Sequence, residues 1–192
     1  MPDQIVQSVY FENAGPENTE RTLQLAYERA QALGIEHVIV ATTTGRTGAL
    51  AAELFREQNV VVVTHSTGFA GPNKQELQPE FRDRIEAAGG QLVTAQHALG
   101  GIGRAVRRKL GSYQIDEIIA FTLRNFCQGV KVACEITTMA ADSGKIPAGQ
   151  EVIAIGGTGR GADAALVLVS ANVQDFFDLR VLEVICKPRC WS

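Results

Sequence analysis

Apolar and polar positions alternate along the chain in blocks that predict strands and helices in turn. Val38–Ala41 and Val60–Val63 are continuous, largely β-branched apolar runs, which are typical of strands buried on both faces of a parallel sheet. Between them, apolar residues recur from Leu50 to Phe55 at the spacing of one helix face. This order of strand, helix and strand indicates the α/β class, with parallel strands joined by right-handed crossovers.

The rest of the chain continues the pattern with one interruption. Further strands are expected at residues 5–11, 91–95, 151–155, 164–170 and 179–186, and further helices at 19–33, 79–88, 99–110, 115–126 and 128–143. The last three helices follow one another without a strand, which indicates a helical insertion. The short loop before residues 164–170 favours an antiparallel orientation for that strand.

Composition and charge limit the function classes. A chain of 192 residues with 45% hydrophobic and 20% charged residues fits a single domain, residues 1–192. Its net charge of -3 argues against a general partner among nucleic acids or anionic membranes. The sequence contains neither an apolar run near the ~18 residues of a membrane span nor the pattern of a signal peptide. We therefore expect a soluble, cytoplasmic protein.

The four cysteines do not indicate a metal site. Cys127 and Cys134 lie on one predicted helix, and Cys186 and Cys190 lie near the C-terminus. Neither pair has the spacing of a zinc site, and no histidine is close to them in sequence. Ordinary free thiols are the expected state, and no metal is expected.

The turn after the strand at residues 38–42 has the features of an anion site. It joins this strand to a helix, and the first amides of such a helix lack intrahelical partners and favour an anion. Three threonines, a glycine and an arginine occupy the turn and the first helical positions, and their hydroxyl and guanidinium groups suit phosphate or carboxylate. The alternative is an ordinary threonine cap with a solvated arginine.

A second glycine-rich loop, at residues 156–161, also follows a strand and also carries a threonine and an arginine. If the two strands are neighbours, both loops lie at the edge where open α/β sheets bind ligands. Neither loop has the spacing of a dinucleotide fingerprint or of a P-loop. A further loop, Gly68–Gly71, contains enough glycine to act as a lid. The candidate ligand-binding residues are Thr42, Thr43, Thr44, Gly45, Arg46, Thr47, Thr67, Gly68, Gly157, Thr158, Gly159, Arg160 and Gly161.

Two histidines are weaker candidates for catalysis. His65 and His97 each follow a predicted strand at the ligand edge, where a neutral imidazole could act as acid or base. The alternative for each is a hydrogen bond to loop backbone. The basic run at residues 104–109 is expected to be mostly solvated, and Lys131 and Glu135 are expected to pair along a helix for a few tenths of a kcal/mol.

Two stretches resemble the C-terminal domain of pyruvate kinase. One runs from Val38 to Thr64 and contains the strand, the Thr-Gly-Arg-Thr turn, the helix and the next strand. The other, Gly149–Gly157, is similar to the hairpin that closes that domain. In many pyruvate kinases the equivalent turn holds a phosphate of the allosteric sugar bisphosphate, and the hairpin loop folds over the same effector.

The whole chain is similar to a largely uncharacterised family of small stand-alone proteins with that domain's fold. The matching segments are residues 10–12, 17–20, 43–48, 128–132, 139–142 and 156–163, while Cys127 stands where glycine is expected. The resemblance implies a three-layer α/β/α fold with a mixed five-stranded sheet of order 3-2-1-4-5, its last strand antiparallel, and a helical insertion between strands 3 and 4. It also implies flavin mononucleotide (FMN) as a ligand, since FMN has been associated with a member.

The expected function is therefore the binding of a phosphorylated small molecule, with FMN as the named candidate, on the two Thr/Gly/Arg loops. Pyruvate kinase activity is not implied, because that catalysis takes place in a (β/α)8 barrel of about 250 residues. Two alternatives stay open. One is an enzyme that uses His65 or His97 as acid or base on a phosphorylated substrate. The other is a regulatory or homo-oligomeric module without a small ligand.

Overall fold

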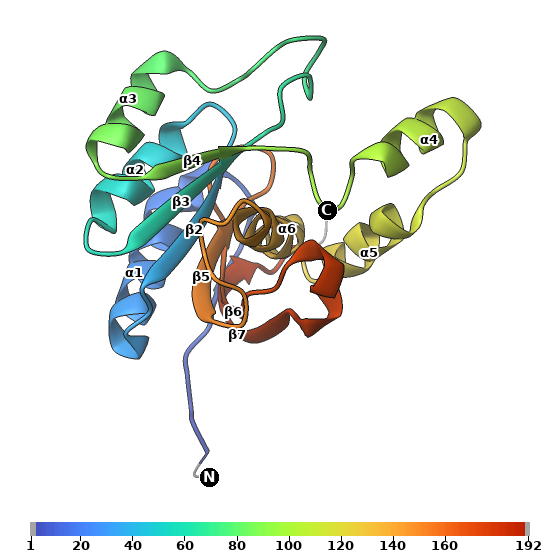
Figure 1. Ribbon diagram of the computed structural model, residues 1–192. Coiled ribbons are helices and arrows are strands. Elements are labelled where there is room, and N and C mark those ends of the chain that lie inside the picture. Colours follow the sequence, from blue (N-terminus) through green and yellow to red (C-terminus); the bar gives the residue numbers. More distant parts are fainter. Residues whose placement is uncertain (1–2, 191–192) are drawn as a thin grey trace.

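The computed structural model describes residues 3–190, which form one mixed sheet with helices on both faces (Figure 1). The sheet has seven strands in the order β1-β7-β6-β5-β2-β3-β4. The strands are β1 Val9–Phe11, β2 His37–Thr42, β3 Asn59–Thr64, β4 Gln91–Thr94, β5 Glu151–Gly156, β6 Ala164–Val169 and β7 Arg180–Pro188. The helices are α1 Thr19–Leu33, α2 Arg46–Leu54, α3 Pro79–Ala87, α4 Ile102–Leu110, α5 Ile115–Arg124 and α6 Gln128–Asp142, with short 3-10 helices at Pro16–Asn18 and Val173–Asp178.

The α/β class, the three layers and the helical insertion are confirmed, but the sheet is larger than predicted. The five strands of the order that the resemblance implied are β4, β3, β2, β5 and β6, and they lie in that order. β6 runs antiparallel to β5, as expected. The five-stranded sheet was wrong in ending at β6, because the strands predicted near both ends of the chain join it: β7 pairs antiparallel with β6, and β1 pairs parallel with β7. β7 satisfies the free backbone edge that β6 would otherwise expose.

Two apolar cores hold the layers together, one on each face of the sheet. Helices α1, α2 and α3 cover one face, where Leu23, Phe55 and Ile85 pack on apolar residues of the strands. Helix α6 covers the other face with Ile136 and Met139. Because the central residues of β2, β3 and β5 are buried on both faces, their side chains are apolar, and this explains the continuous runs in the sequence.

Helices α4 and α5 extend beyond the sheet (Figure 1). Both were predicted, but several of their large apolar side chains are exposed: Ile102 of α4 is 74% exposed and Ile115 of α5 is 75% exposed. No helix within residues 3–190 combines the length and the apolar character needed to cross a membrane.

Candidate functional site

A pocket of about 900 Å³ opens at the carboxyl edge of β2, β3 and β5. It passes over the sheet edge, so one end lies beside α1 and α2 and the other beside α6. The first end is lined by Pro16, Glu17, Thr19, Glu20, Thr42, Thr43, Thr44, Arg46, Thr47, Leu50, Gly157, Gly159, Arg160 and Gly161. The rest of the lining is Ala41, Val63, Thr64, His65, Phe69, His97, Arg104, Arg124, Gln128, Lys131, Val132, Glu135, Ile136 and Met139. We call the first end the loop end and the second the α6 end.

The turn between β2 and α2 forms the wall of the loop end. The hydroxyl oxygen of Thr42 accepts hydrogen bonds from the amides of Gly45 (3.1 Å) and Gly48 (3.5 Å), and these bonds fix the turn. Within residues 3–190, the amides of Thr43, Thr44, Arg46 and Thr47 donate no hydrogen bond. Two of the four amides at the helix terminus are therefore already satisfied, while those of Arg46 and Thr47, and of Thr43 and Thr44 in the preceding turn, stay unpaired in the part of the chain described.

Gly45 shapes this turn without lining the pocket. Its φ of 105° lies in the left-handed region, and a Cβ there would come within 2.5 Å of the Phe81 Cβ. The turn therefore packs tightly on α3. A side chain at position 45 would push α3 away or change the turn, so Gly45 acts on the site through the backbone.

Arg46 and Arg160 place two guanidinium groups in the lining of the loop end. In the part of the chain that the structure describes, neither guanidinium has an ion pair or a side-chain hydrogen bond. Glu17 and Glu20 line the same end and also have no ion pair there. Free arginines suit a phosphate, and free carboxylates suit the hydroxyl groups of a polyol or sugar.

The second glycine-rich loop faces the first, because β2 and β5 are parallel neighbours. Asp163 secures it: one carboxylate oxygen accepts hydrogen bonds from the amides of Thr158 (3.2 Å) and Gly15 (3.1 Å). Burial raises the pKa of the Asp163 carboxyl group. A Cβ at Gly157 would come within 2.3 Å of the Gly161 carbonyl oxygen, so only glycine permits this close return of the chain.

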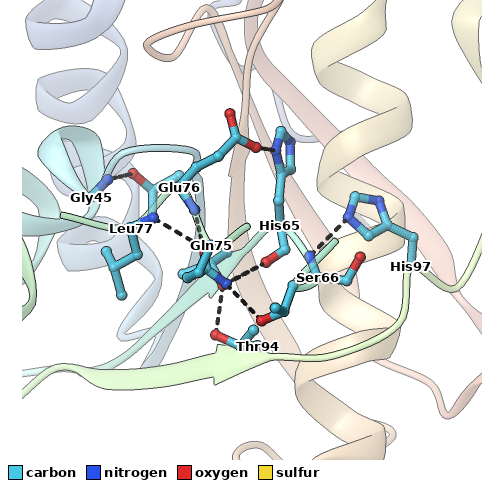
Figure 2. A network of polar contacts seen from close by, with 11 residues as sticks. Gly45, His65, Ser66, Gln75, Glu76, Leu77, Thr94 and His97 are labelled. Atoms are coloured by element: carbon cyan, nitrogen blue, oxygen red, sulfur yellow. Dashed lines mark hydrogen bonds and ion pairs between the residues drawn. The ribbon is translucent and has the colours of Figure 1, made fainter. Parts of the chain in front are cut away.

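His65 and His97 follow β3 and β4, as predicted, and they lie side by side in the lining of the α6 end (Figure 2). The His65 Nδ1 is 2.8 Å from a Glu76 carboxylate oxygen. The Ser66 amide donates to the His97 Nε2 (3.4 Å), which is the backbone bond that the alternative interpretation expected. Burial lowers the pKa of His97 to about 4, so this ring is neutral at neutral pH.

Four of the predicted ligand residues do not line the pocket: Gly45, Thr67, Gly68 and Thr158. The Thr67 hydroxyl instead accepts a hydrogen bond from Gln75 (3.4 Å). From the expected lid loop it is Phe69 that reaches the pocket, with its ring stacked on His97 at a centroid distance of 4.9 Å. The other predicted positions, from Thr42 to Thr47 and from Gly157 to Gly161, do line it.

The sequence interpretation missed most of the α6 end. Lys131 and Glu135 do pair along the helix, as expected, but they are only 4% and 3% exposed, so the pair is buried and not the weak pair that was expected. Arg104 was expected in solvent, but it lines the pocket with its guanidinium 4.9 Å from the Phe69 ring centroid. One signal was available in the sequence: the Lys131–Glu135 pair lies on a helix whose other positions are apolar or small almost all round.

Among residues 3–190, no group of three or more His, Cys, Asp or Glu side chains is arranged to hold a metal ion. The chemistry on offer at this pocket is thus the binding of anions by amides, hydroxyls and cationic side chains, together with the imidazole groups of His65 and His97.

Comparison with known families agrees with the architecture. The family described as "Pyruvate kinase, alpha/beta domain" matches residues 20–168, which is most of the chain. The chain belongs to this family. The family match spans both the turn at Thr42–Thr47 and the loop at Gly157–Gly161.

Solved structures similar to the chain include two of pyruvate kinase from Cryptosporidium parvum. The first is 16% identical, with a TM-score of 0.42, over 80% of this chain and 23% of that one. The second is 18% identical, with a TM-score of 0.35, over 72% of this chain and 20% of that one. The chain thus covers about a quarter or less of the length of these family members.

Proposed function

We propose that this protein binds a phosphorylated small molecule, with the phosphate at the loop end of the pocket. The observation that carries the proposal is the turn at Thr42–Thr47, where four amides have no acceptor within residues 3–190 and threonines line the same space. Arg46 and Arg160 lie on two facing loops, and neither has an ionic partner among the residues described. Amides, hydroxyls and arginines are the donors that hold phosphate in proteins.

FMN is the first candidate ligand, on the strength of the family resemblance and of the pocket's size and lining. A pocket of about 900 Å³ lies in the usual range for sites that hold small molecules. Beyond the loop end, Ala41, Val63, Ile136 and Met139 provide an apolar lining. FMN consists of a phosphate, a polyol and a flat ring. In this proposal the phosphate lies on the amides and arginines of the loop end, the polyol hydroxyls lie beside Glu17 and Glu20, and the ring lies against the apolar lining.

The direct test is to identify what the purified protein carries. The protein is denatured, and the released small molecules are analysed by absorption and mass spectrometry. A yellow flavin supports FMN, and a phosphosugar or nucleotide would keep the phosphate proposal while replacing FMN. A protein that releases nothing and whose melting temperature ignores FMN and inorganic phosphate would contradict the proposal and favour the regulatory module.

Substitution of Arg46 tests the phosphate site itself. We expect Arg46→Ala to weaken FMN binding by about 1.5–3 kcal/mol, because it removes a charge-assisted hydrogen bond. Fluorescence titration of the flavin measures the change. Arg56→Ala is the matched control, since Arg56 is an exposed arginine just beyond the other end of α2. Equal affinities of the Arg46 and Arg56 variants would refute the assignment.

An enzyme that acts on the phosphorylated ligand is a second candidate, favoured by the His65–Glu76 pair. A carboxylate 2.8 Å from the Nδ1 orients the imidazole, and the Nε2 has no hydrogen-bond partner within residues 3–190. Such an arrangement suits a general base. His97 is the poorer choice, because its Nε2 accepts the Ser66 amide. His65→Gln would then abolish turnover and preserve ligand binding.

A further inference from the structure

The α6 end of the pocket contains a buried lysine with unused donors. Lys131 lies in the first turn of α6, lines the pocket, and is 4% exposed. Its ammonium group has three donors, and the only acceptor found for them in the described chain is one oxygen of Glu135. A buried donor without an acceptor is costly, so the open side of this ammonium group favours an acceptor that enters from the pocket.

The partner of Lys131 is held in place from the other side. One carboxylate oxygen of Glu135 accepts a hydrogen bond from the Leu99 amide (2.9 Å). The other oxygen, which contacts Lys131, lies 3.9 Å from the His97 Nδ1. Because α6 and the segment after β4 both fix Glu135, the ammonium group is fixed as well, and it presents its free donors at a constant place.

The charges at this end do not balance. Arg104 and Arg124 line the pocket and are close enough to Lys131 to lower its pKa, although burial is the main cause of that shift. Neither arginine has an acidic partner in the part of the chain described. The Arg124 Nε donates to a neutral group, the Gln128 side chain (2.6 Å). Three cationic side chains therefore line this end of the pocket together with the carboxylate of Glu135.

We propose that the α6 end is a second anion-binding point, where Lys131, Arg104 and Arg124 hold an oxyanion of the same ligand that places its phosphate at the loop end. The inference rests on the proposed function and narrows its ligand class to phosphate esters with a second anionic group, such as a carboxylate or another phosphate. Ala41, Val63 and Met139 add an apolar lining to the same pocket, on the α6 face of the sheet. A flavin meets this requirement when its ring is reduced and anionic.

Inorganic phosphate is the probe that tests the two ends separately. We expect isothermal titration calorimetry to show two phosphate ions bound to the wild-type protein. Lys131→Met with Glu135→Gln removes the buried pair together, so that no unpaired charge stays behind to unfold the protein. This double variant should bind one of the two ions at least tenfold more weakly and keep the other. Arg46→Ala should weaken the binding of the ion at the loop end and keep the ion at the α6 end.

Two controls and a second measurement keep the result decisive. Lys109→Met removes one positive charge from the exposed face of α4, as Arg46→Ala does at the loop end, and should keep both ions. Crystals soaked in tungstate should show density at both ends of the pocket, and circular dichroism should show that each variant is folded. A single ion that depends on Arg46 and ignores the double substitution would overturn this inference and leave the proposed function standing. A single ion that depends on Lys131 would overturn the phosphate assignment at the loop end.

Discussion

The two ends of the pocket are built in different ways. The loop end is made mostly by short continuous segments, Thr42–Thr47 and Gly157–Gly161, whose backbone amides and hydroxyls face the ligand space. The α6 end is assembled from side chains on β2, β3, α4, α5 and α6 and on the loops after β3 and β4. The loop end needs two local turns and the pairing of β2 with β5. The α6 end needs many more separate segments to come together.

This difference has an energetic consequence. At the loop end Arg46 and Arg160 are exposed, so their substitution should affect binding more than folding. The α6 end buries a charged pair, Lys131 and Glu135, whose desolvation is offset by their mutual attraction and by the bond from the Leu99 amide. Substitutions of this pair should therefore lower the free energy of unfolding strongly.

The largest expected effect is that of Glu135→Gln on stability. The substitution leaves the Lys131 ammonium group buried without its counter-charge, and we expect the free energy of unfolding to fall by about 3 kcal/mol. Urea denaturation at neutral pH measures the change. Thr43→Ala at the loop end is the comparison and should cost less than about 0.5 kcal/mol. Similar losses for the two variants would show that the two ends do not differ in this way.

A smaller effect should appear in the pH dependence of stability. Burial lowers the pKa of His97 from 6.5 to about 4, so between these values the unfolded chain binds a proton that the folded chain does not. Stability should therefore fall as the pH falls from about 6.5 to about 4, with about 2 kcal/mol of the loss due to His97.

His97→Gln isolates this contribution. Glutamine can still accept the Ser66 amide, but it does not titrate, so the variant should lose less stability over the same pH range than the wild type. Denaturant unfolding at several pH values from 6.5 to 4 gives the two slopes. Parallel slopes would mean that His97 does not stay neutral in the folded protein.

The difference between the ends also explains what the sequence could predict. The turn at Thr42–Thr47 and the loop at Gly157–Gly161 are visible because each follows a strand and carries its donors within a few residues. The two loops face each other only if β2 and β5 are neighbouring parallel strands. The sequence could state this condition but not test it, and the structure shows that β2 and β5 do pair in parallel. The helices and strands were predictable for a similar reason. The apolar periodicity of α1 and the apolar runs of β2 and β3 follow directly from which of their side chains are buried.

The α6 end could not be predicted, because spacing along one helix does not say what covers it. Lys131 and Glu135 look like an ordinary surface pair until the segment after β4 brings His97 and the Leu99 amide against them. The sequence places Arg104 on an amphipathic helix whether its side chain is solvated or lines the pocket. Only its contact with the Phe69 ring shows which of the two is the case. The places of β1 and β7 depend in the same way on backbone pairing between the two ends of the chain.

The central claim is that the loop end holds a phosphate, and the comparison of FMN with riboflavin tests it most directly. The two flavins share the ring and the polyol, and they differ only in the phosphate. If the claim is right, the wild-type protein binds FMN at least tenfold more tightly than riboflavin, as expected from about 1.5–3 kcal/mol for a charged hydrogen bond. If the protein binds both flavins with equal affinity, the phosphate does not lie at Thr42–Thr47 and the account is contradicted.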